Sequence, residues 1–596
     1  MRFLSLVLLC SLSACSVADL TQRSSQQAQI SQVKTLDAER YLISQEAIGR
    51  FGGTLRKVSK GTSPKTLNPW ISDDATSSNI AGKLFEGLLV KDPDTDQVVP
   101  HMASGFEIKQ GGKQIIVKLR PGLKWTDGHA ITADDVIYTW NTLLRDGVAV
   151  SSLRDILLVD GKFPKVTKLD DLSLSFETEE VFAPFLDLIG IAIAPKHDIL
   201  RFFEEHGAKT HEQKQKAFEN YLNVFTKPEE IVSSGAFKLS KIKAGERIEF
   251  NKNPNYFVIN QELKRLPYVD KLVITLVEDE SATIFKFLAK EAHMIDVSPA
   301  NAATIKGLEQ QYGFTLYDMG PSSGTNFVWF NMSANVPEPQ YSWFNDINFR
   351  TAVSYAIDRE NMVNNVYQGL GVALFTAEPQ KSPYYNQNLQ GYARDLSKAQ
   401  ALLAESGFAF KDTEFGKQLY DSDSNRVEFE LYTNAGSRER EQMSSIVVSN
   451  LAELGIKVNF KPIEFNNLVS RIMAGKNYEA MMIGLTGGNE PHGGANVWKS
   501  DGRLHAFDIR SGDKLNPVRA WEKRIDKLFA QGVKSLDFEQ RKKIYDEFQT
   551  IVYKNNPFVY LVSPKSLTAV SNELGNVRRT KYAGVIPHIY EAYIKP

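Results

Sequence analysis

Cysteine is nearly absent from the sequence, and this absence limits how the protein is held together. Cys10 and Cys15 are the only two cysteines among 596 residues. Removal of a leader ahead of Cys15 leaves one thiol, which excludes an intrachain disulfide. The sequence also lacks any run of 18 consecutive apolar residues, so we expect no transmembrane helix.

An excess of charge of one sign is also missing. Lysine and arginine number 70 and aspartate and glutamate 71, which gives a formal net charge of −1 at pH 7. Such a balance offers no basic surface to nucleic acid or to an anionic membrane. We therefore predict no nucleic-acid partner, and a ligand that is recognised by shape and local chemistry.

Catalytic and metal-binding motifs are lacking as well. The sequence contains no His-Glu-x-x-His motif and no Gly-x-x-x-x-Gly-Lys-Ser/Thr phosphate loop. Residues 320–324 fit the pattern Gly-x-Ser-x-Gly, but the strand expected at 326–332 follows the serine. A nucleophile elbow needs that strand before the serine. We predict that the protein is not an enzyme and holds no cofactor and no metal.

The N-terminus is typical of a secretory signal. Arg2 precedes an apolar run of about ten residues, and small residues follow up to Cys15. Residues 12–15, Leu-Ser-Ala-Cys, resemble the bacterial lipobox, in which the cysteine thiol receives a diacylglyceryl group before cleavage. We predict a signal peptide at 1–14, lipidation of Cys15, and a flexible, Ser- and Gln-rich tether at 15–45.

The rest of the chain has the pattern of a soluble α/β protein. A length of 596 residues is too great for one compact core, so two or more lobes are expected. Residues 114–119 have the pattern of a strand, Asp127 and Gly128 that of a turn, and residues 132–135 that of a helix-starting capping box. One long helix is predicted at 348–367. Strands and helices that alternate through short links indicate mixed α/β lobes.

Seven short segments, taken in their order along the chain, resemble one protein family. The most specific is 119–128, Leu-Arg-Pro-Gly-Leu-Lys-Trp-Thr-Asp-Gly. The other six are residues 66–69, 84–89, 132–136, 234–239, 253–257 and 347–359. Through these segments the chain resembles the extracellular solute-binding proteins of family 5, the peptide/nickel-binding class, from about residue 53 to the C-terminus.

The resemblance implies a particular α/β fold, with two lobes that close about a hinge (type II) and an extra subdomain on the first lobe. Ligand would bind between the lobes, and the closed form would dock onto a permease. The segments implied are lobe I at 46–85, 196–318 and 563–596, the extra subdomain at 86–195, and lobe II at 319–562.

The resemblance also places two segments at the ligand. Relatives use the backbone of the first, and often an acidic side chain, to pair with an extended ligand by strand addition. In this sequence the first segment supplies Trp70, Asp73, Asp74, Ala75 and Thr76. The second supplies Leu485, Thr486, Gly487, Asn489 and Glu490. The alternative for Asp73 and Asp74 is a solvated acidic turn.

The second segment departs from the family at one position. Peptide binders of this family commonly carry an aspartate there that receives the ligand's ammonium group, and this chain has Gly487. Glu490 is the candidate replacement, with bracing of the loop as its alternative role. Trp498 is a candidate stacking face for a sugar or an aromatic group, with a place in the core as its alternative.

Together these features predict the lipid-anchored, substrate-binding component of an ABC importer at the periplasmic or extracellular face of a bacterial membrane. We expect a monomer whose partners are a peptide or another small polar ligand, the permease with its ATPase, and the membrane through the anchor alone. The alternatives are an oligosaccharide or a metal complex as ligand, or a ligand-sensing adaptor without transport.

Overall fold

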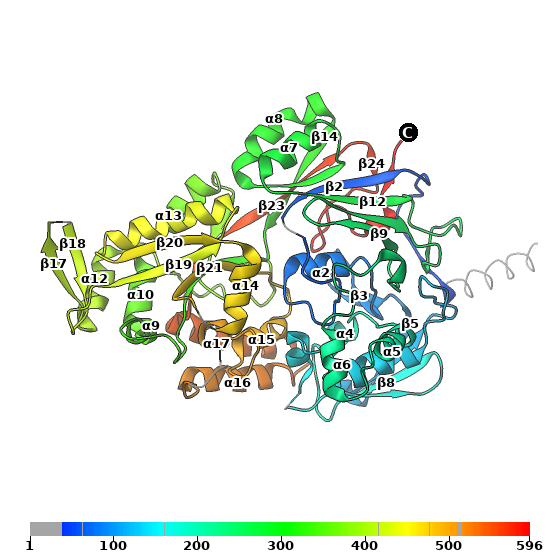
Figure 1. Cartoon of the computed structure of the whole chain (residues 1–596), viewed down its shortest axis with the longest axis horizontal. Helices are drawn as coiled ribbons and strands as arrows, with labels where there is room; N and C mark the ends of the chain where they lie inside the picture. The colour runs from blue at the N-terminus through cyan, green and yellow to red at the C-terminus, as the bar shows by residue number, and fades with distance from the viewer. Residues whose placement is uncertain (1–38, 62, 160, 415, 476, 510–514) are drawn as a thin grey trace, which may run out of the picture.

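The structure is a computed structural model that describes residues 39–596 apart from 62, 160, 415, 476 and 510–514. The predicted signal peptide, Cys15 and most of the predicted tether lie outside the described residues. The described chain forms two lobes side by side, each built around its own sheet (Figure 1). None of the helices in this part of the chain has the length and apolar character that a bilayer crossing requires.

Folded structure begins earlier than the sequence predicted. Leu42–Ile43 forms β1, which pairs in parallel with β11 (Val258–Ile259). Arg120 Nη1 donates a hydrogen bond of 2.9 Å to the carbonyl oxygen of Tyr41. The end of the predicted tether is therefore part of lobe I, because Leu42 and Ile43 gain strand partners and Leu42 also packs against the core.

Lobe I contains an eight-stranded mixed sheet with β2 at its centre. β2 runs parallel to its neighbours β12 and β13, and the other pairs are antiparallel. Helices α7 (Glu280–Leu288) and α8 (Ala302–Tyr312) pack against it in one apolar cluster. In spatial order the strands are β14 (Phe314–Pro321), β23 (Val562–Ser571), β13 (Met294–Val297), β2 (Thr54–Lys60), β12 (Lys271–Val277), β10 (Arg247–Lys252) and β9 (Phe237–Lys243), with β16 (Gly371–Ala373) beside β23.

The extra subdomain is an antiparallel four-stranded sheet with short helices. The order is β5 (Ala103–Lys109), β6 (Gln114–Leu119), β8 (Ser173–Glu177) and β7 (Lys165–Lys168), so the strand predicted at 114–119 is present. The subdomain shares one hydrophobic core with lobe I. Its helical elements and those that lead back to lobe I are α3 (Ala133–Ile137), the π-helical η2 (Tyr138–Arg145), η3 (Ser152–Leu157), α4 (Phe185–Ile189), α5 (Lys196–Glu205) and α6 (His211–Phe218).

The predicted capping box starts α3. The side chain of Thr132 accepts from the backbone N–H of Asp134 at 3.2 Å, and the carboxylate of Asp135 accepts from that of Thr132 at 3.0 Å. Two donors that the helix itself leaves unpaired are thus satisfied.

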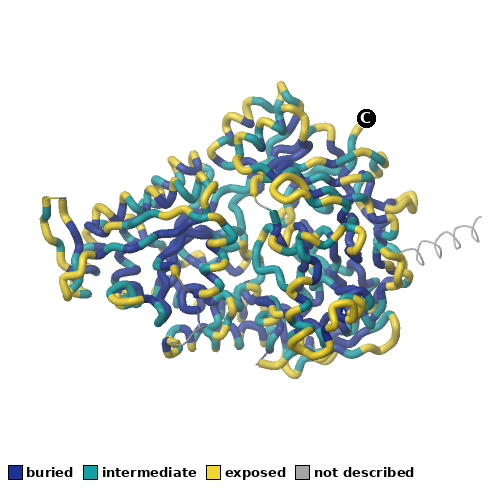
Figure 2. Tube along the Cα trace, viewed as in Figure 1, coloured by how far each residue is buried: buried dark blue, intermediate teal, exposed yellow. Residues whose placement is uncertain are grey.

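Lobe II has a five-stranded sheet flanked by longer helices. Its order is β20 (Lys457–Ile463), β19 (Glu428–Asn434), β21 (Ala480–Leu485), β15 (Thr325–Phe330) and β22 (Phe558–Tyr560). Figure 2 shows buried segments gathered inside each lobe, and this lobe has a core of its own. The main helices are α9 (Gln340–Asn345), α10 (Ile347–Ala356), α12 (Leu396–Glu405), α13 (Arg438–Ala452), α14 (Phe465–Ala474), α16 (Ala520–Gly532) and α17 (Phe538–Asn555). Its smaller elements are α11 (Arg359–Asn361), α15 (Ala495–Trp498) and the strand pair β17 (Ala409–Thr413) with β18 (Gly416–Tyr420).

The smaller elements of lobe I and its subdomain are α2 (Ala75–Ala81) and the strand pairs β3 (Leu89–Lys91) with β4 (Val98–Pro100) and β24 (Leu574–Gly575) with β25 (Tyr593–Ile594).

The long helix predicted at 348–367 is interrupted. α10 ends at Ala356, the next residue, Ile357, has an extended ψ of 125°, and a new turn starts at Asp358. The carboxylate of Asp358 accepts from the backbone N–H of Asn361 at 2.8 Å. Aspartate competes with the helix for backbone donors in this way, which an apolar period alone does not reveal.

Two short crossings join the lobes. The first, residues 322–324, leads from β14 to β15, and the second, Leu561, leads from β22 to β23. The hydroxyl of Ser563 donates to the carbonyl oxygens of Ser322 at 3.1 Å and Gly324 at 2.8 Å, so the crossings lie side by side. The Gly-x-Ser-x-Gly pattern is therefore part of a link between lobes, with a strand on each side.

Candidate ligand cleft between the lobes

Three cavities are lined in part by one C-terminal segment, residues 579–590. The lobe I cavity has a volume of about 680 Å³ and is walled by strands of lobe I, by α2 and by residues 583–590. The interlobe cavity, of about 440 Å³, shares Ala583 with it. A third hollow, of about 460 Å³, shares Tyr582 with the interlobe cavity and presents Lys381, Arg579 and Lys581. Sequence reasoning missed the 579–590 segment, because it carries no motif.

The interlobe cavity has walls from both halves of the molecule. Lobe II contributes the loop after β21, from Gly487 to Gly493, together with Ser323 of the first crossing. The opposite wall belongs to lobe I and the extra subdomain and is made of Lys91, Asp92, Pro93, Asp96, Pro184, Asp187, Leu188, Tyr582 and Ala583. A molecule in this cavity touches both lobes at once.

Direct contacts also hold the lobes together beside this cavity. Lys60 of β2 forms an ion pair with Glu439 of α13, with 3.7 Å between Nζ and Oε2. The backbone N–H of Arg503 in lobe II donates to Asp155 of η3 at 3.0 Å. The conformation is therefore one in which lobe II and the extra subdomain already touch.

The first predicted segment lies on lobe I and does not share a cavity with the second. Ala75 and Thr76, at the start of α2, line the lobe I cavity. Asp74 caps α2 by accepting from the backbone N–H of Ser77 at 2.8 Å. Asp73 accepts from the hydroxyl of Ser152 at 2.5 Å. Both carboxylates thus have local structural partners.

Both tryptophans are core residues, which is the alternative role considered for Trp498 and differs from the ligand contact expected of Trp70. Trp70 has no exposed surface, and its indole N–H donates to the carbonyl oxygen of Ala192 at 2.8 Å. Trp498 is 6% exposed and packs against Phe548 and Phe558, with ring centroids 5.3 and 4.9 Å away. The sequence shows an aromatic residue but does not show which neighbours enclose it.

The second predicted segment supplies three residues to the interlobe cavity, namely Gly487, Asn489 and Glu490. Leu485 is the last residue of β21 and pairs with Thr325, and Thr486 is exposed.

Lack of space explains why position 487 is a glycine. A side-chain carbon there would overlap the backbone carbonyl oxygen of Ser323. Any larger residue at 487 therefore forces the loop and the first crossing apart. The neighbouring Gly488 has open space around it.

Glu490 is already neutralised. Its carboxylate forms a hydrogen-bonded ion pair with the guanidinium of Arg541 in α17, whose side chain is only 8% exposed. Glu490 also accepts from the backbone N–H of His492 at 3.2 Å, which fixes the turn that follows. Of the two roles considered for Glu490, the structure gives it the bracing one.

Negative charge in the interlobe cavity comes mainly from the opposite wall. The amine of Lys91 lies 2.9 Å from the carboxylate of Asp187 and 3.4 Å from that of Asp96. Asp92 is occupied by the backbone N–H groups of Asp94 and Thr95 and makes no ion pair with a described residue. Among the residues that line this wall, one amine therefore faces three carboxylates, and the excess negative charge of the lining is partly offset by Arg541, Arg578 and Lys581 outside it. Burial raises the pKa of the Asp187 carboxyl, which Lys91 partly offsets.

The lobe I cavity carries three lysines, Lys57, Lys60 and Lys83, among largely apolar walls. Burial, with repulsion from Lys57, lowers the pKa of the Lys83 amine to about 8. The walls around it include Phe237, Leu272 and Ile274. Arg440 of α13 in lobe II is a cation that forms no ion pair with a described residue. Its guanidinium is held by the neutral side chains of Asn326 at 3.2 Å and Asn434 at 2.7 Å.

Comparison with known proteins agrees with this architecture. A curated relative from Deinococcus radiodurans, named "Probable ABC transporter-binding protein", is 28% identical over 533 residues, which are 86% of this chain and 87% of the relative. The structure of the oligopeptide-binding protein AppA from Bacillus subtilis in complex with a nonapeptide matches with a TM-score of 0.75 at 24% identity, over 92% of this chain and all of that one. The structure of MelB from Agrobacterium fabrum C58 in complex with stachyose matches with a TM-score of 0.77 at 18% identity, over 92% of this chain and 86% of that one.

The fold and the cavity with walls from both lobes define a two-lobed solute-binding protein. The family model described as bacterial extracellular solute-binding proteins, family 5, matches residues 97–503. The chain belongs to that family. It is a solute-binding protein of the ABC-importer type, as the sequence predicted.

Proposed function

We propose that the protein captures a peptide in the interlobe cavity and hands it to an ABC permease outside the cytoplasmic membrane, tethered by lipid on Cys15 and acting as a monomer. The observation that carries the proposal is that the cavity is lined by both lobes and that one of its walls has more carboxylates than amines. Among the residues that line this wall, the three carboxylates of Asp92, Asp96 and Asp187 face a single amine. An ammonium group is the ligand end that such a wall attracts.

The same arrangement explains why a peptide remains the preferred ligand although Gly487 replaces an acidic residue. The carboxylates lie across the cavity from Gly487, on the wall formed by lobe I and the extra subdomain. A peptide whose ammonium group binds these carboxylates on the wall of lobe I and the extra subdomain can contact lobe II with the rest of its chain. Ligand contact with both lobes favours the closed form over the open one. The AppA structure with its nonapeptide supports this ligand class.

The test uses the Asp187→Asn variant with tri- to pentapeptides offered in two forms, with a free N-terminus and with an acetylated one. Acetylation removes the ammonium charge. Calorimetric titration should give at least about tenfold weaker binding of acetylated peptides to the unaltered protein, and a much smaller difference in Asp187→Asn. Equal losses in the two proteins would remove Asp187 from the site.

A second experiment locates the ligand in the cavity. Gly488→Trp fills the interlobe cavity from a position with open space. Gly307→Trp places the same side chain on the exposed face of α8 and is the matched control. Gly488→Trp should bind at least about tenfold more weakly, and Gly307→Trp should bind unchanged. Unchanged binding by both would exclude this cavity.

An oligosaccharide is the second candidate ligand, and the pairing of Glu490 with Arg541 favours it. That pairing leaves the lobe II wall without a free carboxylate among the described residues that line the cavity. A neutral sugar needs hydrogen bonds and no counter-ion, and MelB was solved with stachyose. Binding of a neutral oligosaccharide that is lost in Gly488→Trp and unchanged in Asp187→Asn would favour this candidate over a peptide.

The anchor has its own test. Cys15→Ser should abolish incorporation of labelled fatty acid and release the protein from membranes. Membrane retention that is unchanged in this variant would refute the anchor, whatever the ligand.

A further inference from the structure

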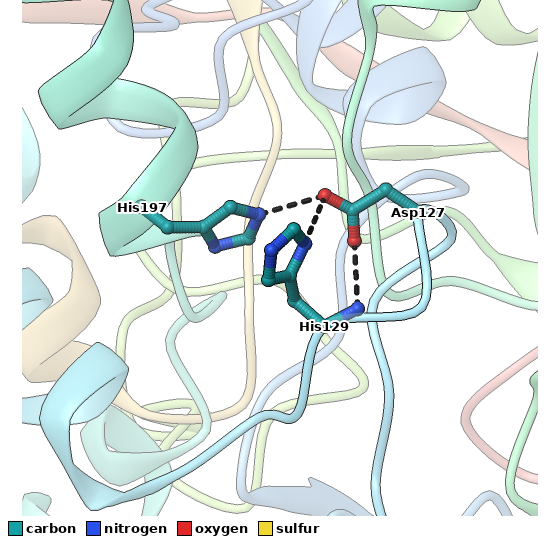
Figure 3. Close-up of side chains that lie close together, drawn as sticks. All are labelled: Asp127, His129 and His197. Carbon is teal, nitrogen blue, oxygen red and sulfur yellow. Dashed lines mark hydrogen bonds and ion pairs between the residues drawn. The ribbon is translucent and has the colours of Figure 1, made fainter.

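Three side chains of lobe I and its subdomain point their polar atoms at one spot, away from every cavity described above. Asp127 and His129 lie on the turn after β6, and His197 lies in the first turn of α5. One carboxylate oxygen, Oδ2 of Asp127, is 2.9 Å from Nδ1 of His129 and 2.7 Å from Nε2 of His197 (Figure 3). The two imidazole rings are tilted by 34° to each other, with centroids 4.2 Å apart.

We propose that Asp127, His129 and His197 form a binding site for a transition-metal dication of the Zn²⁺ class. Two imidazole nitrogens and one carboxylate oxygen are a donor set that Zn²⁺ takes in proteins, with a fourth position left for water. The three atoms already lie within 4.8 Å of one another. Ligands at about 2.0–2.1 Å from a tetrahedral ion are about 3.3 Å apart, so the two distances from Asp127 Oδ2 to the imidazole nitrogens would each open by only about half an ångström.

The surroundings hold the donors in place. The second oxygen of Asp127 accepts from the backbone N–H of His129 at 3.1 Å, which leaves Oδ2 to face the imidazoles. The backbone N–H of Thr126 donates to the carbonyl oxygen of Ser233 at 2.9 Å, so the turn is fixed to lobe I. At α5 the backbone N–H of Lys196 donates to Asp135 at 3.1 Å. These bonds orient the Asp127 carboxylate and fix the two backbone segments that carry the imidazoles.

The site is open to solvent, so an ion can reach it. The exposed fractions of the side chains are 29% for Asp127, 65% for His129 and 32% for His197. α5 lies on the side of lobe I away from lobe II (Figure 1). A bound ion would tie the turn after β6 to α5 without contact with the interlobe ligand. The proposal is independent of which solute the cleft takes.

The test is equilibrium dialysis of the chelator-treated full chain against Co²⁺, which reports its coordination through visible absorption, and against Zn²⁺. We expect one ion per chain and a tetrahedral Co²⁺ spectrum. His129→Ala and His197→Ala should each weaken binding at least about tenfold, because each removes a ligand. His211→Ala, at the exposed start of α6, is the matched control and should bind as the unaltered protein does.

Thermal unfolding separates loss of the site from loss of the fold. Zn²⁺ should raise the unfolding temperature of the unaltered protein and of His211→Ala, and leave that of His197→Ala where chelator puts it. Absence of a bound ion, or binding that both site variants leave intact while they remain folded, would overturn the proposal. In that case the three side chains act only as a hydrogen-bonded link.

Discussion

The imidazole of His492 in lobe II lies 2.8 Å, from its Nε2 atom, from the carbonyl oxygen of Ile156 in η3 of the extra subdomain. Phe182 of the subdomain packs edge-on against the same ring, with centroids 5.3 Å apart. A histidine of one lobe is thus enclosed by the other half of the molecule. Burial lowers the pKa of His492 to about 4, which keeps the ring neutral.

This enclosure predicts a loss of stability in acid. A histidine with a folded-state pKa below its unfolded value near 6.5 takes up a proton more readily when exposed. Stability should therefore be complete above pH 6.5 and fall by up to about 3 kcal/mol as the pH falls to about 4. The measurement is urea unfolding at several pH values. Because the raised pKa of Glu591, about 7, acts in the opposite direction, the quantity to follow is the difference from His492→Gln. A difference that does not change with pH would contradict the prediction.

Much of the fold is predictable from the sequence, because local signals and packing agree there. The strand at 114–119 alternates buried and outward residues, and the capping box at 132–135 uses its side chains on the nearest backbone groups. Each depends on neighbours in sequence. The helix predicted at 348–367 failed at Asp358, where a polar side chain replaces a helical hydrogen bond with a local one.

The site is less predictable, because long-range neighbours decide it. Trp70 and Trp498 have the residue type of ligand-stacking side chains, but distant aromatic residues enclose both. Asp187 has no motif, and only the fold brings it opposite the loop after β21. Family resemblance found that loop, whereas the facing wall emerged only with the structure.

The ion pair of Glu490 and Arg541 predicts a strong dependence of stability on one carboxylate. Glu490→Gln leaves the 8% exposed guanidinium without its counter-ion and should destabilise the protein by about 2–4 kcal/mol. Glu547→Gln is the matched control, since it breaks the exposed pair of Glu547 with Arg524. That change should shift the midpoint of urea unfolding only slightly. Equal shifts in the two variants would mean that burial does not strengthen the first pair.

Lys83 predicts a pH dependence of the same sign as that of His492 but at alkaline pH, because its charge too opposes folding. Its amine has a folded-state pKa of about 8, below the ordinary value of 10.5, so the unfolded chain holds its proton to higher pH. The free energy of unfolding therefore rises as the pH increases from 8 to 10.5, because over that range the folded protein has lost the Lys83 proton and the unfolded chain still holds it. Lys83→Met should therefore be more stable than the unaltered protein at pH 7, by about 1–3 kcal/mol, with the advantage shrinking above pH 8. Urea unfolding at pH 7 and pH 10 measures it. A constant advantage would show that the gain comes from apolar packing and not from removal of a buried charge.

Gly487 provides the sharpest test of why this chain departs from its peptide-binding relatives. If the departure were only a loss of function, an aspartate restored at 487 would fit and would add an ammonium partner. The backbone oxygen of Ser323 occupies the space for that side chain, and a backbone atom in a chain crossing cannot rotate away. Gly487→Asp should therefore lower the free energy of unfolding by about 1–3 kcal/mol, as overpacking does. Gly488→Asp adds the same charge where nothing lies within 4 Å, and it should cost much less. Urea unfolding of the two variants separates sterics from charge. A Gly487→Asp protein as stable as Gly488→Asp would show that the loop moves freely, and the steric explanation would then fail.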